Sequence, residues 1–300
     1  MRYKSGFVIA AVSSGSGKTT VTNGLLRAFK NRGFKVAPFK TGPDFIDTQF
    51  HKVAAGMESV NLDVFMSDEQ HVKSLFQRYS AGSDVRIVEG VMGLFDGYDK
   101  RKGSAAHIAE LTGLPVVLVI NAASSAYSLA AVLSGFKNFD KRIKIAGVIF
   151  NNVASENHQR LLKSAAEDAG VTLLGCLKRN PYMTMPSRHL GLSLGDDNVI
   201  ESFIDRASDA VKVGIDLDLL LSLTQIDKDE KSDDTHVADK CHLISCPSRK
   251  IALAYDEAFN FVYTENLRLL EQNLRFGGEI IKFSPLRDTR MPDADFLYLP

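Results

Sequence analysis

The chain has 300 residues, of which 45% are hydrophobic and 24% are charged, so it has enough apolar material for a folded core. Basic and acidic residues number 36 each, so bulk charge does not attract nucleic acid, and no nucleic-acid partner is expected. No apolar run approaches the ~18 residues of a membrane-spanning helix. Three cysteines are too few for a disulfide scaffold in a chain this long. We therefore expect a cytoplasmic protein with no membrane partner, and the length suggests about two domains.

Short runs rich in Val, Ile and Leu alternate with longer amphipathic stretches along most of the chain. Strands are predicted at residues 6–12, 35–39, 85–88, 116–120, 145–150 and 173–177. Helices are predicted at residues 18–32, 68–79, 105–111, 125–136, 156–169 and 196–223. Ser67 and Gln70 fit a capping box at the start of the second helix. This alternation predicts an α/β fold, with a mostly parallel sheet covered by helices on both faces.

A change of composition separates this first part of the chain from a shorter C-terminal part. Residues 227–234 are charged and almost free of apolar side chains, which is typical of a solvated linker. Beyond them, strands are predicted at residues 250–255, 279–283 and 295–299, and a helix at 260–274. The predicted organisation is a first domain at residues 1–224, a linker at 225–249 and a partial second domain at 250–300.

The segment SGSGKTT at residues 14–20 follows the first predicted strand and opens a helix. Its backbone N–H groups can surround phosphate oxygens, and its glycines allow the close approach that this needs. Lys18 can neutralise the β- and γ-phosphates, and the Thr19 hydroxyl can bind Mg²⁺. The full motif has glycine where this chain has Val12, but the position between strand and helix favours nucleotide binding. The predicted nucleotide-binding residues here are Gly15, Ser16, Gly17, Lys18, Thr19 and Thr20.

Acidic side chains follow two other predicted strands. Glu89 ends one strand and enters a glycine-bearing loop that contains Asp96. The segment KTGPDFID, with Lys40, Asp44 and Asp47, follows another strand through a rigid Gly-Pro turn. Carboxylates at one sheet edge suit Mg²⁺, so Glu89 is a candidate metal ligand. A solvated rim residue and ordinary turn chemistry are the alternatives.

Asn151 and Asn152 close the strand predicted at residues 145–150. A carboxamide carries both a donor and an acceptor, which suits the edge of adenine, although a strand-end asparagine can also cap a turn. The histidines, His51 and His107 among them, show no metal-cluster spacing.

Several segments, in the same order, resemble the cobyrinate a,c-diamide synthase family, which amidates the corrin ring in cobalamin synthesis. They are SSGSGKTTVT, PFKTGPDFID, EGVMGLFDG, RHLGL, KIALAYDEAFNFVYTENLRLLE, FSPL and LYLP. Families acting on hydrogenobyrinate or Ni-sirohydrochlorin share these segments, so the ring substrate stays open.

The resemblance implies a phosphate-loop domain similar to dethiobiotin synthetase. This domain would bind Mg-ATP and phosphorylate a substrate carboxylate, and ammonia derived from glutamine would attack the acyl phosphate. The chain would thus be a carbon–nitrogen ligase with glutamine as amido-nitrogen donor. The resemblance implies catalytic roles for Lys18, Lys40, Asp47 and Asp96, metal binding by Thr19, Asp44 and Glu89, and adenine reading by Asn151.

Two features depart from the family pattern. Asn121 follows the strand at residues 116–120, where the family leads us to expect aspartate. The second unit resembles the start of a glutamine amidotransferase domain, whose cysteine nucleophile would lie beyond Pro300. Cys176, Cys241 and Cys246 all precede that unit's first strand. The expectation is a chain without its glutaminase centre.

Two rival functions use the same kind of phosphate loop. Partitioning and septum-placing ATPases carry a second lysine early in the loop, whereas residues 11–14 contain none. Dethiobiotin synthetase would have no use for a second α/β unit. The order of the two amidations and the oligomeric state, a homodimer included, stay open.

Overall fold

The computed structural model describes residues 4–180, 183, 197–226, 249–274 and 278–300. The chain divides into two compact units, residues 1–186 with 198–229 and residues 187–197 with 230–300. Within the described residues, no helix is long and apolar enough to cross a membrane.

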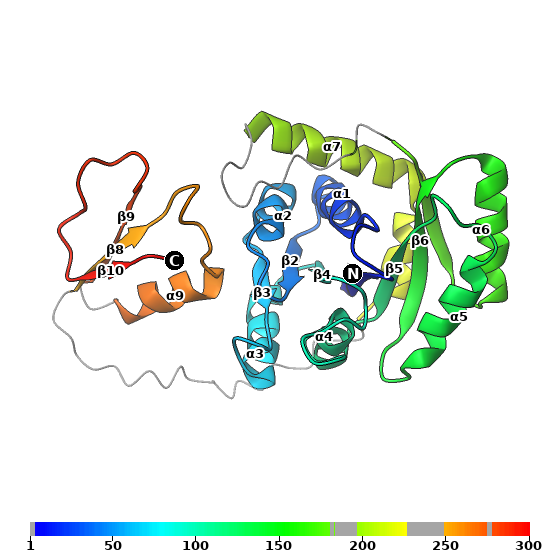
Figure 1. Cartoon of the computed structure of the whole chain (residues 1–300), viewed down its shortest axis with the longest axis horizontal. Helices are drawn as coiled ribbons and strands as arrows, with labels where there is room; N and C mark the ends of the chain where they lie inside the picture. Colours follow the sequence, from blue (N-terminus) through cyan, green and yellow to red (C-terminus); the bar gives the residue numbers. More distant parts are fainter. Residues whose placement is uncertain (1–3, 181–182, 184–196, 227–248, 275–277) are drawn as a thin grey trace. The chain divides into compact units, whose positions relative to one another are not determined.

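A parallel sheet forms the centre of the first unit (Figure 1). Among the described residues it has seven strands in the order β3-β2-β4-β1-β5-β6-β7. The strands are β1 (Ser5–Ala11), β2 (Val36–Thr41), β3 (Val60–Leu62), β4 (Val85–Glu89), β5 (Val116–Asn121), β6 (Ile145–Val153) and β7 (Leu173–Lys178). The predicted α/β fold with a parallel sheet is confirmed.

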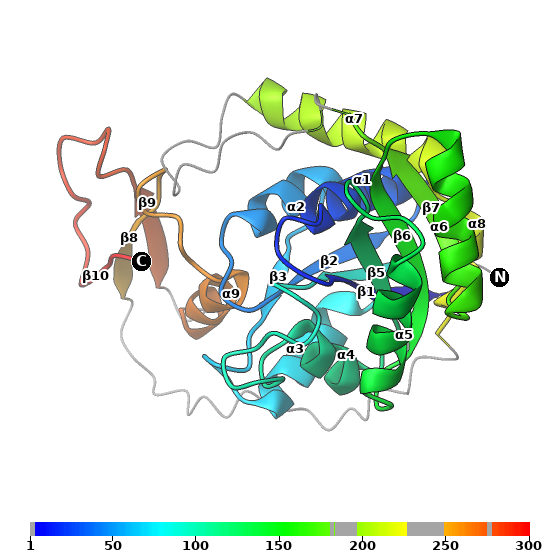
Figure 2. The same ribbon diagram turned by 45° about the vertical axis from the view of Figure 1, so that its right-hand side comes forward.

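Helices cover both faces of this sheet (Figures 1 and 2). They are α1 (Lys18–Asn31), α2 (Asp47–Ala55), α3 (Glu69–Ser80), α4 (Ala105–Thr112), α5 (Leu129–Phe139), α6 (Glu156–Asp168), α7 (Asp197–Gly214) and α8 (Leu217–Leu223). Phe7 and Ile9 of β1 pack with α1, α2, α7 and α8, whereas Val8 and Ala10 pack with α3, α4, α5 and α6. Because side chains alternate along a strand, a strand covered on both faces is apolar throughout.

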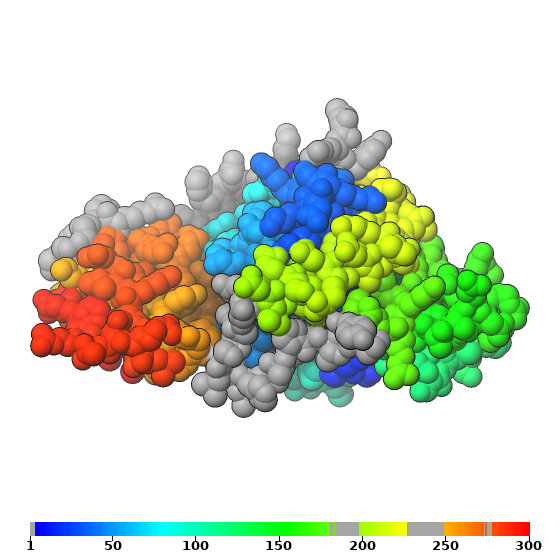
Figure 3. Space-filling view, turned by 90° about the horizontal axis from the view of Figure 1, so that it is seen from above, coloured from blue at the N-terminus to red at the C-terminus, as the bar shows by residue number. Residues whose placement is uncertain are grey.

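Helix α7 lies beside α1 and α2, as the space-filling view from above also shows (Figure 3). Arg27 of α1 pairs with Glu201 and Asp205 of α7 at 2.6 and 2.8 Å. The same guanidinium donates to the backbone carbonyls of Val53 and Ala54 at the end of α2. This one side chain therefore ties α1, α2 and α7 together.

The structure corrects several local expectations in the first unit. Strand β3 and helix α2 were not predicted, and α5 begins four residues later than the predicted helix at 125–136. Helix α3 is capped by Asp68, whose carboxylate accepts from the backbone N–H of His71 at 2.7 Å. The Ser67 hydroxyl instead donates to the Asp63 carbonyl, so the expected Ser67–Gln70 capping box is wrong. The physical reason is that Asp63 starts its own turn one residue after β3.

The second unit begins a parallel sheet of its own. Within the described residues, β8 (Lys250–Ala254) lies between β9 (Glu279–Phe283) and β10 (Phe296–Tyr298), and α9 (Thr264–Asn273) joins β8 to β9. Gln225 and Ile226, which the sequence assigned to the linker, pair with the backbone of Ser5 and Lys4. Linker residues 227–248 lie outside the described part, so the domain boundaries stay a prediction.

The strand order places the site. Strand β1 is central, with β4 on one side and β5 on the other, and the chain returns to opposite sides of it. In parallel α/β sheets this reversal point, at the carboxyl ends of the strands, is where ligands bind. The carboxyl ends of β1, β2 and β4 all lie at this edge of the sheet.

Candidate active site

The loop from β1 to α1 has the backbone of a phosphate-binding loop. Gly15 and Gly17 have φ values of +75° and +94°, a region that only glycine enters freely. A Cβ at Gly17 would lie 2.2 Å from Nδ2 of Asn151. The Ser16 hydroxyl donates to the Ser13 carbonyl at 2.9 Å and holds the turn closed. Both glycines are therefore required by conformation, and Gly17 also by space.

Lys18 begins α1 directly after this loop and is buried. Its ammonium donates to the carbonyl of Met92, in the loop after β4, at 2.5 Å. Burial lowers the pKa of Lys18, an effect that the charge of Glu89 partly opposes. Met92 has a φ of +49°, a strained value for a residue with a side chain. The lysine thus lies where phosphate oxygens would offer it stronger acceptors than one carbonyl.

Lys40 of β2 lies at the centre of a buried cluster of charges. Its Nζ lies 2.5 Å from Oδ2 of Asp47, 3.0 Å from Oε1 of Glu89 and 3.4 Å from Oδ2 of Asp44. The pairing of β2 with β4 sets Lys40 opposite Glu89, and Asp47 opens α2. Lys40, Asp47 and Glu89 are each at most 2% exposed. The sheet register therefore creates this cluster.

Paired charges keep this cluster ionised. Burial alone would lower the pKa of Lys40, but the negative charges of Glu89 and Asp47 raise it above its ordinary value. Burial alone would raise the pKa of the Glu89 carboxyl, but the charge of Lys40 and a hydrogen bond from His51 hold it well below its usual range. The pKa of Asp44 is also lowered, because the charge of Lys40 outweighs its burial.

His51 joins the same cluster, although no local pattern in the sequence assigned it a role. Its Nε2 lies 2.7 Å from Oε2 of Glu89, and its Nδ1 lies 3.2 Å from the hydroxyl of Ser59. The imidazole is completely buried on α2. Both carboxylate oxygens of Glu89 are thus engaged, one by His51 and the other by Lys40 and Thr19. The signal would have been α2 itself, which places His51 one helical turn after Asp47.

Thr19 brings the phosphate loop to this cluster. Its hydroxyl donates to Oε1 of Glu89 at 2.7 Å and lies 3.3 Å from Oδ2 of Asp47. Among the described residues, no three His, Cys, Asp or Glu side chains form a metal site by themselves. Mg²⁺ is usually held by one or two carboxylates together with substrate phosphates and water rather than by a protein cage. Thr19 and Glu89 supply such an incomplete set of hard oxygen ligands, so the residues fit Mg²⁺.

Two other predicted residues, Asp44 and Asp96, hold local backbone structure. Oδ1 of Asp44 accepts from the backbone N–H groups of Ile46 and Asp47, both at 3.0 Å, and so turns the loop into α2. Asp96 is exposed, and its Oδ2 accepts from the backbone N–H of Gly93 at 3.0 Å. The roles of Asp44 as a metal ligand and of Asp96 as a catalytic residue stay predictions.

Asn151 contacts the phosphate loop from the end of β6. Its Nδ2 donates to the carbonyl of Ser16 at 3.1 Å, and its Oδ1 accepts from the N–H of Asn152 at 2.9 Å. Asn152, at a φ of +61°, donates from its side chain to Oδ1 of Asn121 at 3.0 Å. Asn121, where the family pattern led us to expect aspartate, thus belongs to an asparagine network at this edge. Adenine reading by Asn151 stays a prediction.

The structure therefore brings most of the predicted residues to one sheet edge. Those around the buried charges are Thr19, Lys40, Asp44, Asp47 and Glu89, joined by His51. Those of the phosphate loop are Gly15, Ser16, Gly17, Lys18 and Thr20, with Asn151 against them. The RHLGL segment lies outside the described residues.

Comparisons with known proteins show the family to which the chain belongs. The sequence model of the CobQ/CobB/MinD/ParA nucleotide binding domain family matches residues 7–192. Cobyrinate a,c-diamide synthase from Listeria innocua is 43% identical over 97% of this chain and 64% of its own length. The enzyme of that name from Picrophilus torridus is 40% identical over 97% of the chain and 65% of its own. Hydrogenobyrinate a,c-diamide synthase from Brucella ovis is 44% identical over 98% of this chain and 66% of its own length.

These matches confirm the resemblance that the motifs indicated. The chain spans 64 to 66% of the length of these relatives. The activity of the relatives as whole proteins is therefore a proposal for this chain.

Proposed function

Because the chain belongs to the CobQ/CobB/MinD/ParA nucleotide-binding family, we propose that it carries the ATP-dependent half of a tetrapyrrole amidation. The substrates would be the a and c acetate carboxylates of a cobyrinate-type ring in cobalamin synthesis. Support comes from the names of the relatives, which are 40 to 44% identical to the chain. Cobyrinate, hydrogenobyrinate and Ni-sirohydrochlorin all remain candidate rings.

The observation that carries the proposal is the buried Lys40 cluster beside the phosphate loop. A carboxylate is a poor electrophile, and amide formation needs it to be activated first. In the proposed reaction a carboxylate oxygen of the ring attacks the γ-phosphorus of ATP, the bond from phosphorus to the bridging oxygen breaks, and ADP leaves. Ammonia then attacks the acyl carbon, the carbon–oxygen bond to phosphate breaks, and a proton is lost. The products are the amide, ADP and phosphate.

The chain's own residues would hold the two anions together. Phosphoryl transfer depends mainly on positioning and on neutralising charge. The phosphate loop and Lys18 would bind the β- and γ-phosphates, and Lys18 would exchange the Met92 carbonyl for phosphate oxygens. Lys40, already positively charged, would turn toward the incoming carboxylate or γ-phosphate. Asp47 and Glu89 keep it in place until then.

Thr19 and Glu89 would hold a magnesium ion, which would screen the charge of the transferring phosphate. His51 would keep Glu89 oriented for this task from its opposite side. Asp96, exposed at the rim, is the carboxylate that we place nearest the reacting acyl group. Nitrogen would come from glutamine in the whole enzyme or from free ammonia.

The test supplies the purified chain with Mg-ATP, ammonium, bicarbonate as a source of carbon dioxide, and one candidate acid at a time: cobyrinate, hydrogenobyrinate, Ni-sirohydrochlorin or diaminononanoate. We expect ADP release coupled to amide formation, detected by mass spectrometry, with at least one tetrapyrrole. Turnover with diaminononanoate instead would identify a dethiobiotin-synthetase-like ligase. ATP-dependent dimerisation with no amide product from any acid would favour the partitioning type of switch and overturn the proposal.

A further inference from the structure

The turn after β3 presents two large apolar side chains to solvent. Oδ1 of Asp63 accepts from the backbone N–H groups of Phe65 and Met66, at 2.8 and 3.3 Å, which fixes the turn. Phe65 and Met66 are each 67% exposed, while Val64 between them and the sheet is buried. Exposed apolar groups on a rigid turn indicate a contact surface.

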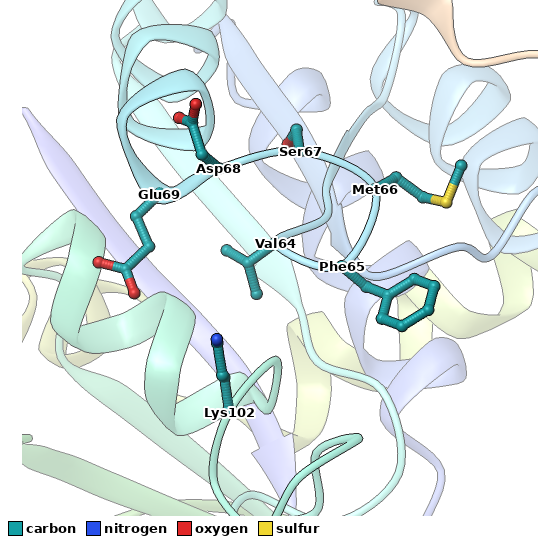
Figure 4. Close-up of a pocket in the computed structure, with 7 residues that line it drawn as sticks. All are labelled: Val64, Phe65, Met66, Ser67, Asp68, Glu69 and Lys102. Atoms are coloured by element: carbon teal, nitrogen blue, oxygen red, sulfur yellow. The ribbon is translucent and has the colours of Figure 1, made fainter.

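The loop after β4 forms the facing wall. Tyr98 is 48% exposed, and its ring meets that of Phe65 edge to face, with centroids 5.2 Å apart. The ammonium of Lys102 lies 5.8 Å from the Tyr98 centroid. Between the two segments lies an open hollow of about 530 Å³, within the size range of small-molecule sites. It is lined by Val64, Phe65, Met66, Ser67, Asp68, Glu69 and Lys102 (Figure 4).

The place of this hollow in the fold relates it to the Lys40 cluster. Strand β2 lies between β3 and β4, so the loops that form the hollow flank the loop that follows Lys40. The side chain of Asn61 in β3 donates to the carbonyls of Gly42 and Asp44, at 2.8 and 3.0 Å, and ties the two edges together. The loop after β4 also supplies Met92, the acceptor for Lys18.

We propose that this hollow seats one edge of the tetrapyrrole ring, so that an acetate side chain reaches Lys40. The proposal rests on the proposed function for its substrate. A flat conjugated ring gains most from aromatic edges and a thioether, which Phe65, Tyr98 and Met66 offer. Figure 4 shows the Lys102 side chain rising toward the Val64–Glu69 turn, where it would meet a ring carboxylate.

The charged side chains of the lining are one ammonium, Lys102, and two carboxylates, Asp68 and Glu69. Among the described residues, no carboxylate lies within ion-pair distance of the Lys102 ammonium. The acidic lining residues are already engaged: Asp68 caps the N–H of His71, and Glu69 lies 3.3 Å from Nε2 of His107. Lys102 is therefore the charge that remains available to a carboxylate.

The experiment measures the Kd of cobyrinate and of the two related rings by titration without ATP, followed through the ring's own visible absorbance. The variants are Phe65→Ala, Lys102→Gln and their combination, and the control is Val213→Ser, an apolar side chain 90% exposed on α7. Because Phe65 and Lys102 are exposed, these variants should fold, which the Kd for an ATP analogue checks independently. We expect the double variant to raise the Kd for the ring and the KM for the ring roughly tenfold or more, with the Kd for the ATP analogue unchanged.

The outcomes of this experiment distinguish a failure of the proposed ring seat from a failure of the proposed function. If the wild-type chain binds and amidates a tetrapyrrole but the double variant binds it equally well, the hollow is not the seat and the proposed function stands. Equal weakening by Val213→Ser would likewise overturn the proposal. If the wild-type chain binds none of the three rings, the proposed function fails and the seat fails with it.

Discussion

At the scale of single residues, the site depends on charges that the fold keeps buried. Removing a lysine or a carboxylate from water costs several kcal/mol, which a good partner offsets. Lys40 has three carboxylates within 3.4 Å, so it stays charged in the interior. Lys18, with one carbonyl as acceptor, has a lowered pKa. The two lysines thus differ in their partners: Lys40 is ion-paired with carboxylates of the protein, whereas Lys18 donates to a neutral carbonyl that an anion could replace.

Lys18→Ala should abolish ATP-dependent amidation while leaving the chain folded. Within the described part of the chain, the Lys18 ammonium donates to the Met92 carbonyl alone, so little structural support is lost. The loss of a cation on the transferring phosphate should lower kcat about a hundredfold or more. Steady-state ADP release and amide formation measure this, with circular dichroism as the check on folding. Full-rate amide formation by a folded variant would remove Lys18 from the mechanism.

Glu89→Gln should raise the magnesium concentration needed for half-maximal activity. The substitution removes an anionic oxygen ligand from a hard cation and leaves a weaker carboxamide acceptor for Thr19. Magnesium titration of amidation measures the shift, and binding of Mg-ATP followed by calorimetry gives a second readout. Asp209→Asn, the same change at a residue whose side chain is 75% exposed, is the matched control. An unchanged titration would make Glu89 a support for Lys40 and nothing more.

At the scale of elements, the sequence predicts the sheet well and the site's helix poorly. The strands that form the core read as Val, Ile and Leu runs because helices cover both of their faces. Helix α2 has no such signature, because its inward face carries Asp47 and His51 beside Phe50. These polar groups can be buried only because Asp47 pairs with Lys40 and His51 contacts Glu89. Such contacts belong to tertiary structure, so no local sequence pattern predicts them.

The same reason explains which site residues could be predicted. The phosphate loop is a local motif, and Gly15, Gly17 and Lys18 are recognisable from their spacing alone. The role of His51 depends on its contact with Glu89, 38 residues away in sequence, and Ser59 contacts His51 in turn. Strand β3 was missed because it has three residues, with Asn61 in the middle. Its function is to hold the loop after Lys40 rather than to add an apolar run.

The loop after β4 is anchored by one arginine. The guanidinium of Arg101 pairs with Glu110 of α4, and its Nε lies 2.7 Å from Oδ2 of Asp140 at the end of α5. A hydrogen bond from Arg142 and the charge of Arg101 lower the pKa of Asp140 to about 2, although its burial opposes this. The anchor therefore fixes the loop that carries Met92 and Asp96 against two helices.

Arg101→Met should lower the free energy of unfolding by about 1.5–3 kcal/mol, because the largely buried carboxylate of Asp140 loses a cationic partner. Arg142→Met, which removes a second partner of the same Asp140, is the control. The side chain of Arg142 is 58% exposed, against 18% for Arg101, so its loss should cost less than about 1 kcal/mol. Urea unfolding of the two variants measures both values. A smaller effect at Arg101 than at Arg142 would show that the loop does not depend on this anchor.

At the scale of the whole molecule, the first unit contains the candidate phosphate site within one sheet, whereas the second unit has a short sheet of its own. The phosphate loop, Lys40, Glu89 and Asn151 all belong to unit 1. In the second unit, β8 is flanked by β9 and β10 and carries the buried residues Ala252, Leu253 and Ala254. The proposed activation of the carboxylate and the proposed supply of nitrogen can be tested separately.

The source of nitrogen gives that test. Glutamine hydrolysis requires an activated thiolate, and these 300 residues contain no cysteine after Cys246. Burial raises the pKa of Cys176 to about 11, so its thiol stays protonated near neutral pH.

A polypeptide of these 300 residues should therefore form the amide from ammonium but not from glutamine. The rate of amide formation should rise with pH, since only neutral NH₃ carries the attacking lone pair. The assay supplies Mg-ATP, the tetrapyrrole acid and either nitrogen source, and measures the amide and glutamate separately. Glutamate release by this polypeptide would show that one of its own groups hydrolyses glutamine, and amide formation from neither source, with ATP binding intact, would count against carboxylate activation by the first unit.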